Sequence, residues 1–197
     1  MTTAKGAARR TALLDAAEAL LVSGGHTALS LRAVADAAGV RLGHLQYYFP
    51  SRDGLVAELL ARILQRSLDH LTESATDGGS GSGTDDVGLD ALVGMVLGQQ
   101  TDTGLVRVFA ELWALAARDE SVATAVRAFY RQYVDLVADR IATHAPGLPP
   151  PERRARAEVF IALVEGASLM RSGIAGTPSA ATDALISGTA LAILTGK

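Results

Sequence analysis

The 197-residue sequence contains no cysteine and only nine aromatic residues, which are four Phe, four Tyr and one Trp. Without cysteine the chain can form neither a disulfide nor a thiolate metal site. β-Branched and aromatic residues are scarce beside abundant alanine, and no alternation of period two marks a strand. The sequence therefore predicts an all-α fold.

Long uncharged runs are also missing. The longest near the C-terminus, residues 184–196, has thirteen residues and is too short to cross a bilayer. Near the N-terminus, Asp15 and Glu18 interrupt the apolar stretch, which is unlike a secretory signal. We therefore expect a cytoplasmic protein.

The net charge of −3 is unevenly distributed along the chain. Residues 1–66 carry eight Lys and Arg against five Asp and Glu, whereas residues 67–197 carry ten against sixteen. The first third of the chain is thus mildly basic, whereas the rest is acidic. This pattern suits a polyanionic partner that binds the first third alone.

Apolar residues at helical spacing predict about nine helices. Ser30 and Ser51 can act as N-caps, and Gly39 can supply the left-handed residue that ends a helix. Residues 74–86, almost all Gly, Ser, Thr and Asp, are expected to form a flexible loop. The expected helices cover residues 7–23, 31–38, 41–47, 51–72, 89–99, 105–117, 121–144, 152–174 and 180–194.

Two short helices around a glycine turn have the spacing of a helix-turn-helix over about residues 30–49. In such a motif, Val34 and Ala35 should face inward and Gly39 should have a positive φ. Val40 and Leu45 should fill the space between the two helices. These five residues together indicate a helix-turn-helix more specifically than any one of them alone.

The segment LSLRAVADAAGVRLGHLQYYFPSRDGLVAELL, residues 29–60, resembles the DNA-binding domain of TetR-family transcriptional regulators. The resemblance implies an all-α homodimer, with a DNA-binding domain at residues 1–50 and an effector-binding and dimerisation domain at 51–197. The helix at 51–72 would connect the two. The residues that carry the likeness are Ala38, Gly39, Val40, Gly43, Leu45, Tyr48, Phe49, Ser51 and Leu55.

The sequence departs from the family pattern at three positions of the expected recognition helix. Arg41 and Leu42 stand where the family commonly has a small polar residue and then Lys, and Gln46 stands where it often has Tyr. The operator sequence therefore cannot be inferred from a relative.

Three consecutive aromatic residues, Tyr47, Tyr48 and Phe49, end the expected recognition helix. They lie about 100° apart around a helix, so they cannot share one environment. We expect Phe49 to face inward with Leu45, Tyr47 to point toward the duplex, and Tyr48 to be intermediate, although all three could still belong to the core.

The candidate DNA contacts combine groups that read base edges with groups that bind phosphate. Arg41 could pair with guanine, His44 with a base edge or phosphate, and Gly43 could let the backbone approach closely. The basic residues Lys5, Arg9 and Arg10 also suit phosphates, although a solvated surface is the alternative for each. The predicted DNA-binding residues are Ser30, Arg32, Arg41, Leu42, Gly43, His44, Gln46, Tyr47, Tyr48 and Arg52.

Large side chains on the expected inward faces of three successive helices could line an effector pocket or form ordinary core. Few charges accompany them, so a mostly apolar effector is expected. The candidate polar anchors are Gln99 and Glu111. The predicted pocket residues are Met95, Phe109, Trp113, Phe129 and Tyr133.

The last two expected helices carry small residues within apolar stripes, which allow close helix approach. We expect a homodimer interface there, with packing against the helix at 121–144 as the alternative. The predicted interface residues are Leu163, Gly166, Ala167, Met170, Ile174, Leu185, Gly188, Thr189 and Ala192.

No pattern in the sequence points to catalysis. His26, His70 and His144 lack the spacing of metal ligands, and neither a Ser/His/Asp arrangement nor a phosphate-binding loop is present. We therefore expect no enzyme activity, metal or cofactor. The expected function is a ligand-responsive repressor of transcription. The alternative is a ligand-binding or interaction protein with a vestigial DNA-binding module.

Overall fold

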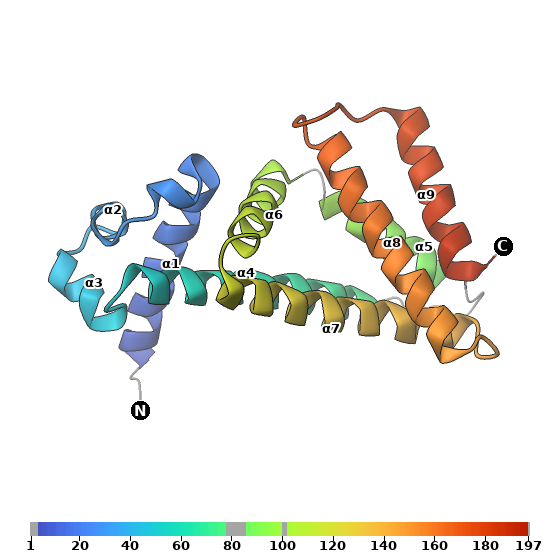
Figure 1. Ribbon diagram of the computed structural model, residues 1–197, viewed down its shortest axis with the longest axis horizontal. Helices are drawn as coiled ribbons and strands as arrows, with labels where there is room; N and C mark the ends of the chain where they lie inside the picture. The colour runs from blue at the N-terminus through green and yellow to red at the C-terminus, as the bar shows by residue number, and fades with distance from the viewer. Residues whose placement is uncertain (1–3, 78–85, 100–101, 197) are drawn as a thin grey trace. The chain divides into compact units, whose positions relative to one another are not determined.

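The computed structural model describes residues 4–77, 86–99 and 102–196, and these contain nine α-helices, one 3-10 turn and no strand. The all-α fold predicted from composition is confirmed (Figure 1). In chain order the elements are α1 (Ala4–Gly24), η1 (His26–Ala28), α2 (Leu31–Ala37), α3 (Leu42–Tyr48), α4 (Arg52–Asp77), α5 (Asp86–Gln99), α6 (Thr103–Ala116), α7 (Glu120–His144), α8 (Pro150–Arg171) and α9 (Ala180–Thr195).

The ends of the helices lie within three residues of their predicted positions, except for the end of α4, and two of the differences are informative. Helix α4 continues to Asp77, so residues 74–77, predicted as loop, are helical, while the remainder of that loop, 78–85, lies outside the described residues. Helix α8 ends at Arg171 rather than 174, because Gly173 adopts a φ of 81° that no helix accommodates.

The described residues fall into two compact units, each with its own core. Unit 1 comprises residues 1–64 and 107–126, and unit 2 comprises 65–106 and 127–197. The boundary predicted at residue 50 followed the sequence motif. Packing instead places the first turns of α4, the end of α6 and the start of α7 with the helix-turn-helix. Helices α4, α6 and α7 thus each contribute residues to both units.

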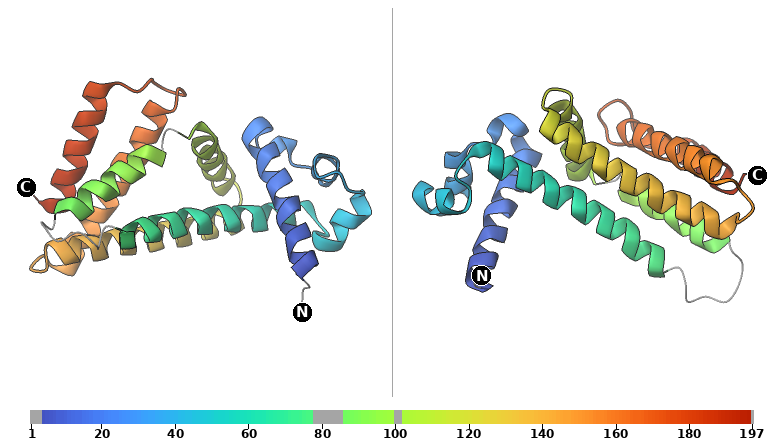
Figure 2. Two further views of the ribbon diagram at one scale, coloured as in Figure 1. Left: turned by 180° about the vertical axis from the view of Figure 1, so that it is seen from behind. Right: turned by 60° about the horizontal axis from the view of Figure 1, so that its bottom comes forward.

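In unit 1, α1 contacts α2 and η1, and α2 contacts α3 (Figures 1 and 2). The apolar stripe of α1, which includes Leu13, Ala17 and Leu21, is buried, as are Leu45 and Phe49 from the end of the motif. Burying a leucine or phenylalanine side chain contributes about 1.5–3 kcal/mol, so this small core can hold the two short helices in place.

In unit 2, α5, α8 and α9 lie side by side, as both figures show. Helix α8 turns Ala157, Phe160, Val164 and Ala167 inward, at the three- and four-residue spacing of one helix face. Within the described part of the chain, no helix has the length and apolarity needed to cross a membrane. No group of three or more metal-binding side chains occurs in those same residues.

Candidate functional site

The turn between α2 and α3 fixes the angle of α3. The Val40 N–H donates to the Ala35 carbonyl at 2.9 Å, and the Gly39 N–H donates to the Asp36 carbonyl at 3.1 Å. These are the two hydrogen bonds of a Schellman motif, which needs a left-handed residue at the position of Gly39. Gly39 has a φ of 64°, so the turn glycine predicted from the sequence is confirmed.

Helix α3 is divided into an inward and an outward face. Leu45 and Phe49 are buried, four residues apart, whereas Tyr47 is 80% exposed. The predicted DNA contacts Arg41, Gly43, His44 and Gln46 are exposed, and Leu42 and Tyr48 are half-buried. The separate environments predicted for the three aromatic residues are therefore observed.

Two edge-to-face contacts order the aromatic side chains on the outer face of α3. The Tyr48 ring centroid lies 5.6 Å from that of His44 and 5.2 Å from that of Tyr47. Edge-to-face packing of this kind limits ring rotation. Tyr48 thus contacts both of its neighbours, and Tyr47 is the large apolar residue that this helix exposes, at 80%.

Gly43 has no steric reason within the chain to be glycine. A Cβ added at this position would meet no atom within 4 Å, and the residue sits in the first turn of α3. Glycine weakens a helix relative to alanine, so its presence lowers stability without improving packing. This observation fits a position where an external surface approaches the backbone.

Several predicted phosphate contacts are held by the protein itself. Ser30 caps α2, its hydroxyl accepting a hydrogen bond from the Ala33 N–H at 3.1 Å. Arg52 donates from Nε to the Leu29 carbonyl at 2.6 Å and from Nη2 to the His26 carbonyl at 2.8 Å. Arg32 remains exposed. The N-cap role predicted for Ser30 is therefore confirmed, whereas Arg52 has a structural role that the sequence did not reveal.

The basic residues expected to lie beside DNA at the N-terminus belong to helix α1. Arg10 forms an ion pair with Glu58 of α4, and its guanidinium carbon lies 5.2 Å from the centroid of the Phe49 ring. Lys5 and Arg9 are exposed. Of the three, Arg10 is already paired and ties α1 to α4.

A long-range polar contact joins the 3-10 turn η1 to α6. His26 Nδ1 lies 2.7 Å from Glu111 Oε2, and the His26 backbone N–H donates to the same oxygen at 3.2 Å. The hydrogen bonds from His26 lower the pKa of the Glu111 carboxyl, against the opposing effect of burial. Glu111, predicted as a ligand anchor, is thus paired with a histidine that lies 85 residues away in the chain.

The five predicted pocket residues belong to different parts of the structure. Phe109 and Trp113 lie in unit 1 with ring centroids 6.3 Å apart. Phe129 and Tyr133 lie in unit 2, 6.1 Å apart and nearly fully buried, and Met95 of the same unit is half-buried. The side chain of Gln99, the other candidate anchor, lies outside the described residues. The pocket assignment remains a prediction.

Sequence reasoning missed a carboxylate beside these aromatic residues. The Tyr130 hydroxyl on α7 donates to Glu165 Oε1 on α8 at 2.9 Å. Tyr130 also packs against Phe129, with ring centroids 5.1 Å apart at 78°. The sequence feature that could have indicated this contact is Glu165 itself, because it is the single charged residue in the segment VFIALVEGASLM, residues 159–170.

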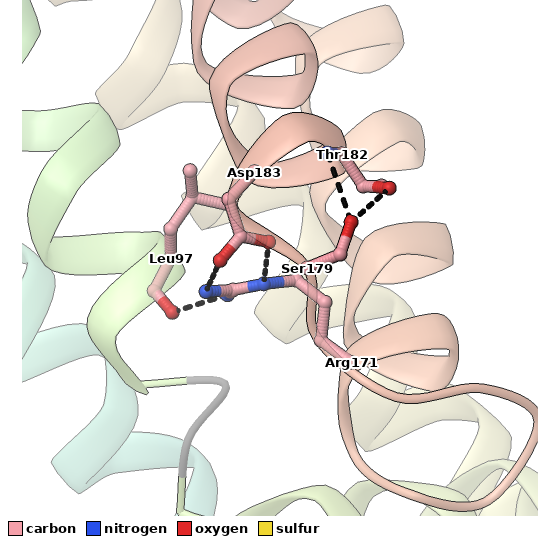
Figure 3. Close-up of polar contacts among 5 residues, drawn as sticks. All are labelled: Leu97, Arg171, Ser179, Thr182 and Asp183. Atoms are coloured by element: carbon pink, nitrogen blue, oxygen red, sulfur yellow. Dashed lines mark hydrogen bonds and ion pairs between the residues drawn. The ribbon is translucent and has the colours of Figure 1, made fainter.

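A second missed cluster holds α5, α8 and α9 together (Figure 3). The Arg171 guanidinium donates to both Asp183 oxygens, at 2.8 and 3.1 Å, and from Nη1 to the Leu97 carbonyl at 2.6 Å. Ser179 caps α9 beside it, accepting from the Thr182 N–H at 3.2 Å. The Arg171 side chain is only 10% exposed, while that of Asp183 is 33% exposed, so the arginine end of the pair is shielded from water and the carboxylate is partly hydrated.

The predicted dimer stripes are mostly on the surface of unit 2. Met170, Ile174 and Leu185 are exposed large apolar residues, and Gly166, Gly188, Thr189 and Ala192 are exposed as well. Leu163 is half-buried. Ala167 is buried on the inner face of α8, one turn beyond Val164, which corrects its place on the predicted surface stripe, and Ile174 is exposed just past the end of that helix. The interface itself remains a prediction.

Two family models match the chain. Residues 13–59 match the model described as bacterial regulatory proteins, tetR family, and residues 87–192 match the C-terminal model of BetI-type transcriptional repressors. The second match alone spans more than half of the sequence. The chain belongs to the TetR family.

Individual relatives agree with this assignment. An HTH-type transcriptional regulator from the dhlA 5′ region of Xanthobacter autotrophicus is 33% identical over 137 residues. The match covers 68% of this TetR-family chain but only 66% of that relative, just under two thirds of its length.

Solved structures share the fold over nearly the whole chain. One from Pseudomonas aeruginosa PAO1 has a TM-score of 0.80 at 21% identity, covering 96% of this chain and 91% of that one. Another, from Saccharomonospora viridis and in complex with choline, has a TM-score of 0.75 at 17% identity, covering 93% and 94%. At these identities the likeness shows the fold alone.

Proposed function

We propose that this TetR-family protein is a homodimeric, DNA-binding repressor that a small-molecule effector releases from its operator in the cytoplasm. The observation that carries the DNA-binding part is the outward face of α3. There Arg41, His44, Gln46 and Tyr47 are exposed above a buried Leu45. Arginine, histidine and amide groups at the start of a recognition helix are suited to base edges and phosphates in a major groove.

Two copies are needed for useful affinity, because one seven-residue helix reads only a few base pairs. In a twofold dimer, the two recognition helices meet half-sites about 34 Å apart, one turn of DNA. The apolar residues exposed on α8 and α9, including Met170 and Leu185, support a self-association surface in unit 2.

The dimer proposal can be tested with Gly166→Arg on the exposed side of α8. A Cβ at Gly166 would meet no atom within 4 Å of the same chain, so the protomer should fold normally. The long charged side chain should instead prevent dimerisation and weaken operator binding. Light scattering that shows the wild-type protein as a monomer at micromolar concentration would contradict the proposal.

The conformational change caused by effector binding must be transmitted to the recognition helices through elements that belong to both units. Helix α4 is one such element. Helix α6 is a second, and its Glu111 contacts His26 of η1, the 3-10 turn that precedes α2. An effector acts only through its different affinity for the two states of the protein, and a coupling of about 1–3 kcal/mol is typical. A displacement of α6 would therefore be felt at η1 and the start of α2.

The function as a whole is tested by gel shift with the region upstream of the protein's own gene, with and without candidate effectors. We expect a shifted band that an effector abolishes. Trp113→Ala should retain operator binding and lose release, whereas normal release in that variant would place the pocket elsewhere. No binding to any upstream DNA would favour a ligand-binding or interaction protein with a vestigial DNA-binding module.

A further inference from the structure

The turn before α2 is held by charged side chains from two other helices of unit 1. Turn η1 (His26–Ala28) leads from α1 to Ser30, the N-cap of α2. The His26 backbone N–H donates to Glu111 Oε2 of α6 at 3.2 Å, and the His26 carbonyl accepts from Arg52 Nη2 of α4 at 2.8 Å. Both backbone polar groups of one residue are therefore bound by side chains from different elements.

Each of these two side chains makes a second contact with the same turn. His26 Nδ1 lies 2.7 Å from the same Glu111 oxygen. Arg52 Nε donates to the carbonyl of Leu29, the residue that ends the turn, at 2.6 Å. Hydrogen bonds that involve an ionised group are shorter and stronger than neutral ones. The direction of η1 thus depends on where α4 and α6 place these two charges.

The backbone before the turn leaves room for the carboxylate. Gly25 has a φ of 68°, and a Cβ added there would lie 2.7 Å from Glu111 Oε1. A side chain at this position would push the carboxylate away from the turn. Gly24 allows similarly close packing, since its added Cβ would lie 2.7 Å from the Ala28 Cβ. The glycine pair that ends α1 therefore also admits a side chain of α6.

Stability alone does not account for this arrangement. The His26 and Glu111 side chains are each 31% exposed, and polar pairs at this exposure contribute little to the free energy of unfolding. Water can satisfy a backbone N–H at such a position almost as well as a side chain does. What the carboxylate adds is a fixed direction, because it ties the turn to one point on α6.

We propose that Glu111 is a positioning residue for operator binding. It holds η1 from α6 while Arg52 holds it from α4, and together they set the direction in which α2 leaves the turn. The Schellman motif at Gly39 fixes α3 to α2, so a change in the direction of α2 is carried to the recognition helix. This role differs from that of an effector anchor, which the sequence suggested for Glu111. The inference rests on the proposed binding to an operator.

The test compares two variants that lose the same charge. Glu111→Gln removes the carboxylate that holds the turn. Glu18→Gln removes a carboxylate of similar exposure, 23%, whose ion pair with Arg62 joins α1 to α4. Both variants become less negative by the same amount, so any general gain in DNA affinity is shared by the two.

Fluorescence anisotropy measures binding to the region upstream of the protein's own gene and to random DNA of equal length, well below the melting temperature of every variant. Glu111→Gln should reduce the preference for upstream DNA by about fivefold or more, equivalent to the loss of one base contact. Glu18→Gln should keep the wild-type preference. A loss of folded protein would weaken binding to both DNAs alike and leave their ratio unchanged. An unchanged ratio in Glu111→Gln, or an equal loss in Glu18→Gln, would overturn the positioning role.

Arg52→Lys tests the other side of the turn. Lysine keeps the positive charge, but its ammonium group cannot reproduce the fork with which the guanidinium binds two carbonyls. The preference for upstream DNA should therefore fall while binding to random DNA is retained. In the double variant with Glu111→Gln, the loss should be smaller than the product of the two separate losses, because both act on one turn. Losses that multiply fully would overturn the shared role.

The proposed function can fail separately from this inference. Wild-type protein that binds no upstream DNA would contradict the repressor function, and the positioning role with it. A normal preference in the wild type together with an unchanged ratio in Glu111→Gln would overturn the positioning role alone.

Discussion

On α3 the polar side chains of Arg41, His44 and Gln46 are exposed, whereas in unit 2 the Arg171 guanidinium is 10% exposed and binds Asp183 and the Leu97 carbonyl. The first group can be altered without disturbing the core beneath it. The second group holds three helices in register. This difference means that substitutions on α3 should change function before stability, and substitutions at the Arg171 cluster should change stability first.

The largest expected effect is the loss of stability in Arg171→Ala. The substitution leaves the Asp183 carboxylate and the Leu97 carbonyl without their shared partner in a partly shielded position. Removing one member of a fully buried ion pair typically costs about 3–5 kcal/mol, and the loss here should lie toward or below the lower end of that range because the Asp183 side chain is 33% exposed and water can solvate part of its charge. Urea denaturation should show this loss in the free energy of unfolding.

Arg154→Ala on the same helix is the matched control for Arg171. Arg154 pairs with Asp135 and Glu158, and all three side chains are largely exposed. Exposed pairs contribute about 0–1 kcal/mol, so this variant should remain close to wild type. Similar losses for both arginines would show that burial of the Arg171 cluster does not matter, and the comparison between the two regions would fail.

The next effect in size concerns DNA rather than stability. Arg41→Ala should weaken binding to the cognate operator by about 1–3 kcal/mol and binding to random DNA by less, if Arg41 reads a base. Its melting temperature should not change, because Arg41 is exposed and makes no side-chain cap on α3. Fluorescence anisotropy on both DNAs measures the difference, and equal losses on all sequences would remove the base-reading role.

Gly43→Ala should separate stability from function by moving them in opposite directions. Alanine fits the open space around Gly43 and favours the helix, so the protein should gain up to about 1 kcal/mol in stability. Operator affinity should fall, because the added methyl group would separate the backbone from DNA. Thermal melting and anisotropy are the two measurements.

Gly39→Ala provides the contrast within the same motif. Gly39 has a φ of 64°, which costs a residue with a Cβ about 1–2 kcal/mol. This variant should lose stability and affinity together. If Gly43→Ala also loses both, then Gly43 serves the fold rather than the approach of DNA.

Local rules explain why the helix-turn-helix could be predicted in such detail. A glycine with positive φ, two short helices and a four-residue spacing from Leu45 to Phe49 are properties of neighbouring residues. The sequence therefore indicated the turn, the inward face and the exposed Tyr47 directly. It did not reveal that Arg52 is held by two carbonyls, since those belong to residues 23 and 26 positions earlier.

Unit 2 could be predicted only at the level of helices. Helical periodicity shows that a residue lies on an apolar stripe, but not whether another element of the same chain covers it. Ala167 and Gly166 are adjacent in the sequence, yet one is buried and the other is exposed. The contacts of Glu165 with Tyr130 and of Arg171 with Leu97 span 35 and 74 residues. No local pattern encodes such pairs.

The smallest expected effect concerns His26 and Glu111, the long-range polar pair of unit 1. Because the His26 hydrogen bonds lower the Glu111 pKa below its ordinary 4.5, the ionised carboxylate stabilises the folded state. This contribution is present above pH 4.5 and is lost as the pH falls through the lowered folded pKa. Glu111→Gln should therefore destabilise the protein slightly at neutral pH and become indistinguishable from wild type in acid.

Melting curves across this pH range, for wild type, Glu111→Gln, His26→Ala and the double variant, isolate the pair. In the His26→Ala background, Glu111→Gln should have a smaller pH-dependent effect, because the ring hydrogen bond is lost while the backbone N–H of residue 26 can still donate to the carboxylate. An undiminished pH dependence without the His26 ring would assign the whole effect to that backbone N–H. If removing the His26–Glu111 pair cost as much free energy of unfolding as removing the Arg171 cluster, unit 1 would also contain a strongly stabilising polar contact. The contrast between exposed functional groups in unit 1 and buried stabilising groups in unit 2 would then not hold.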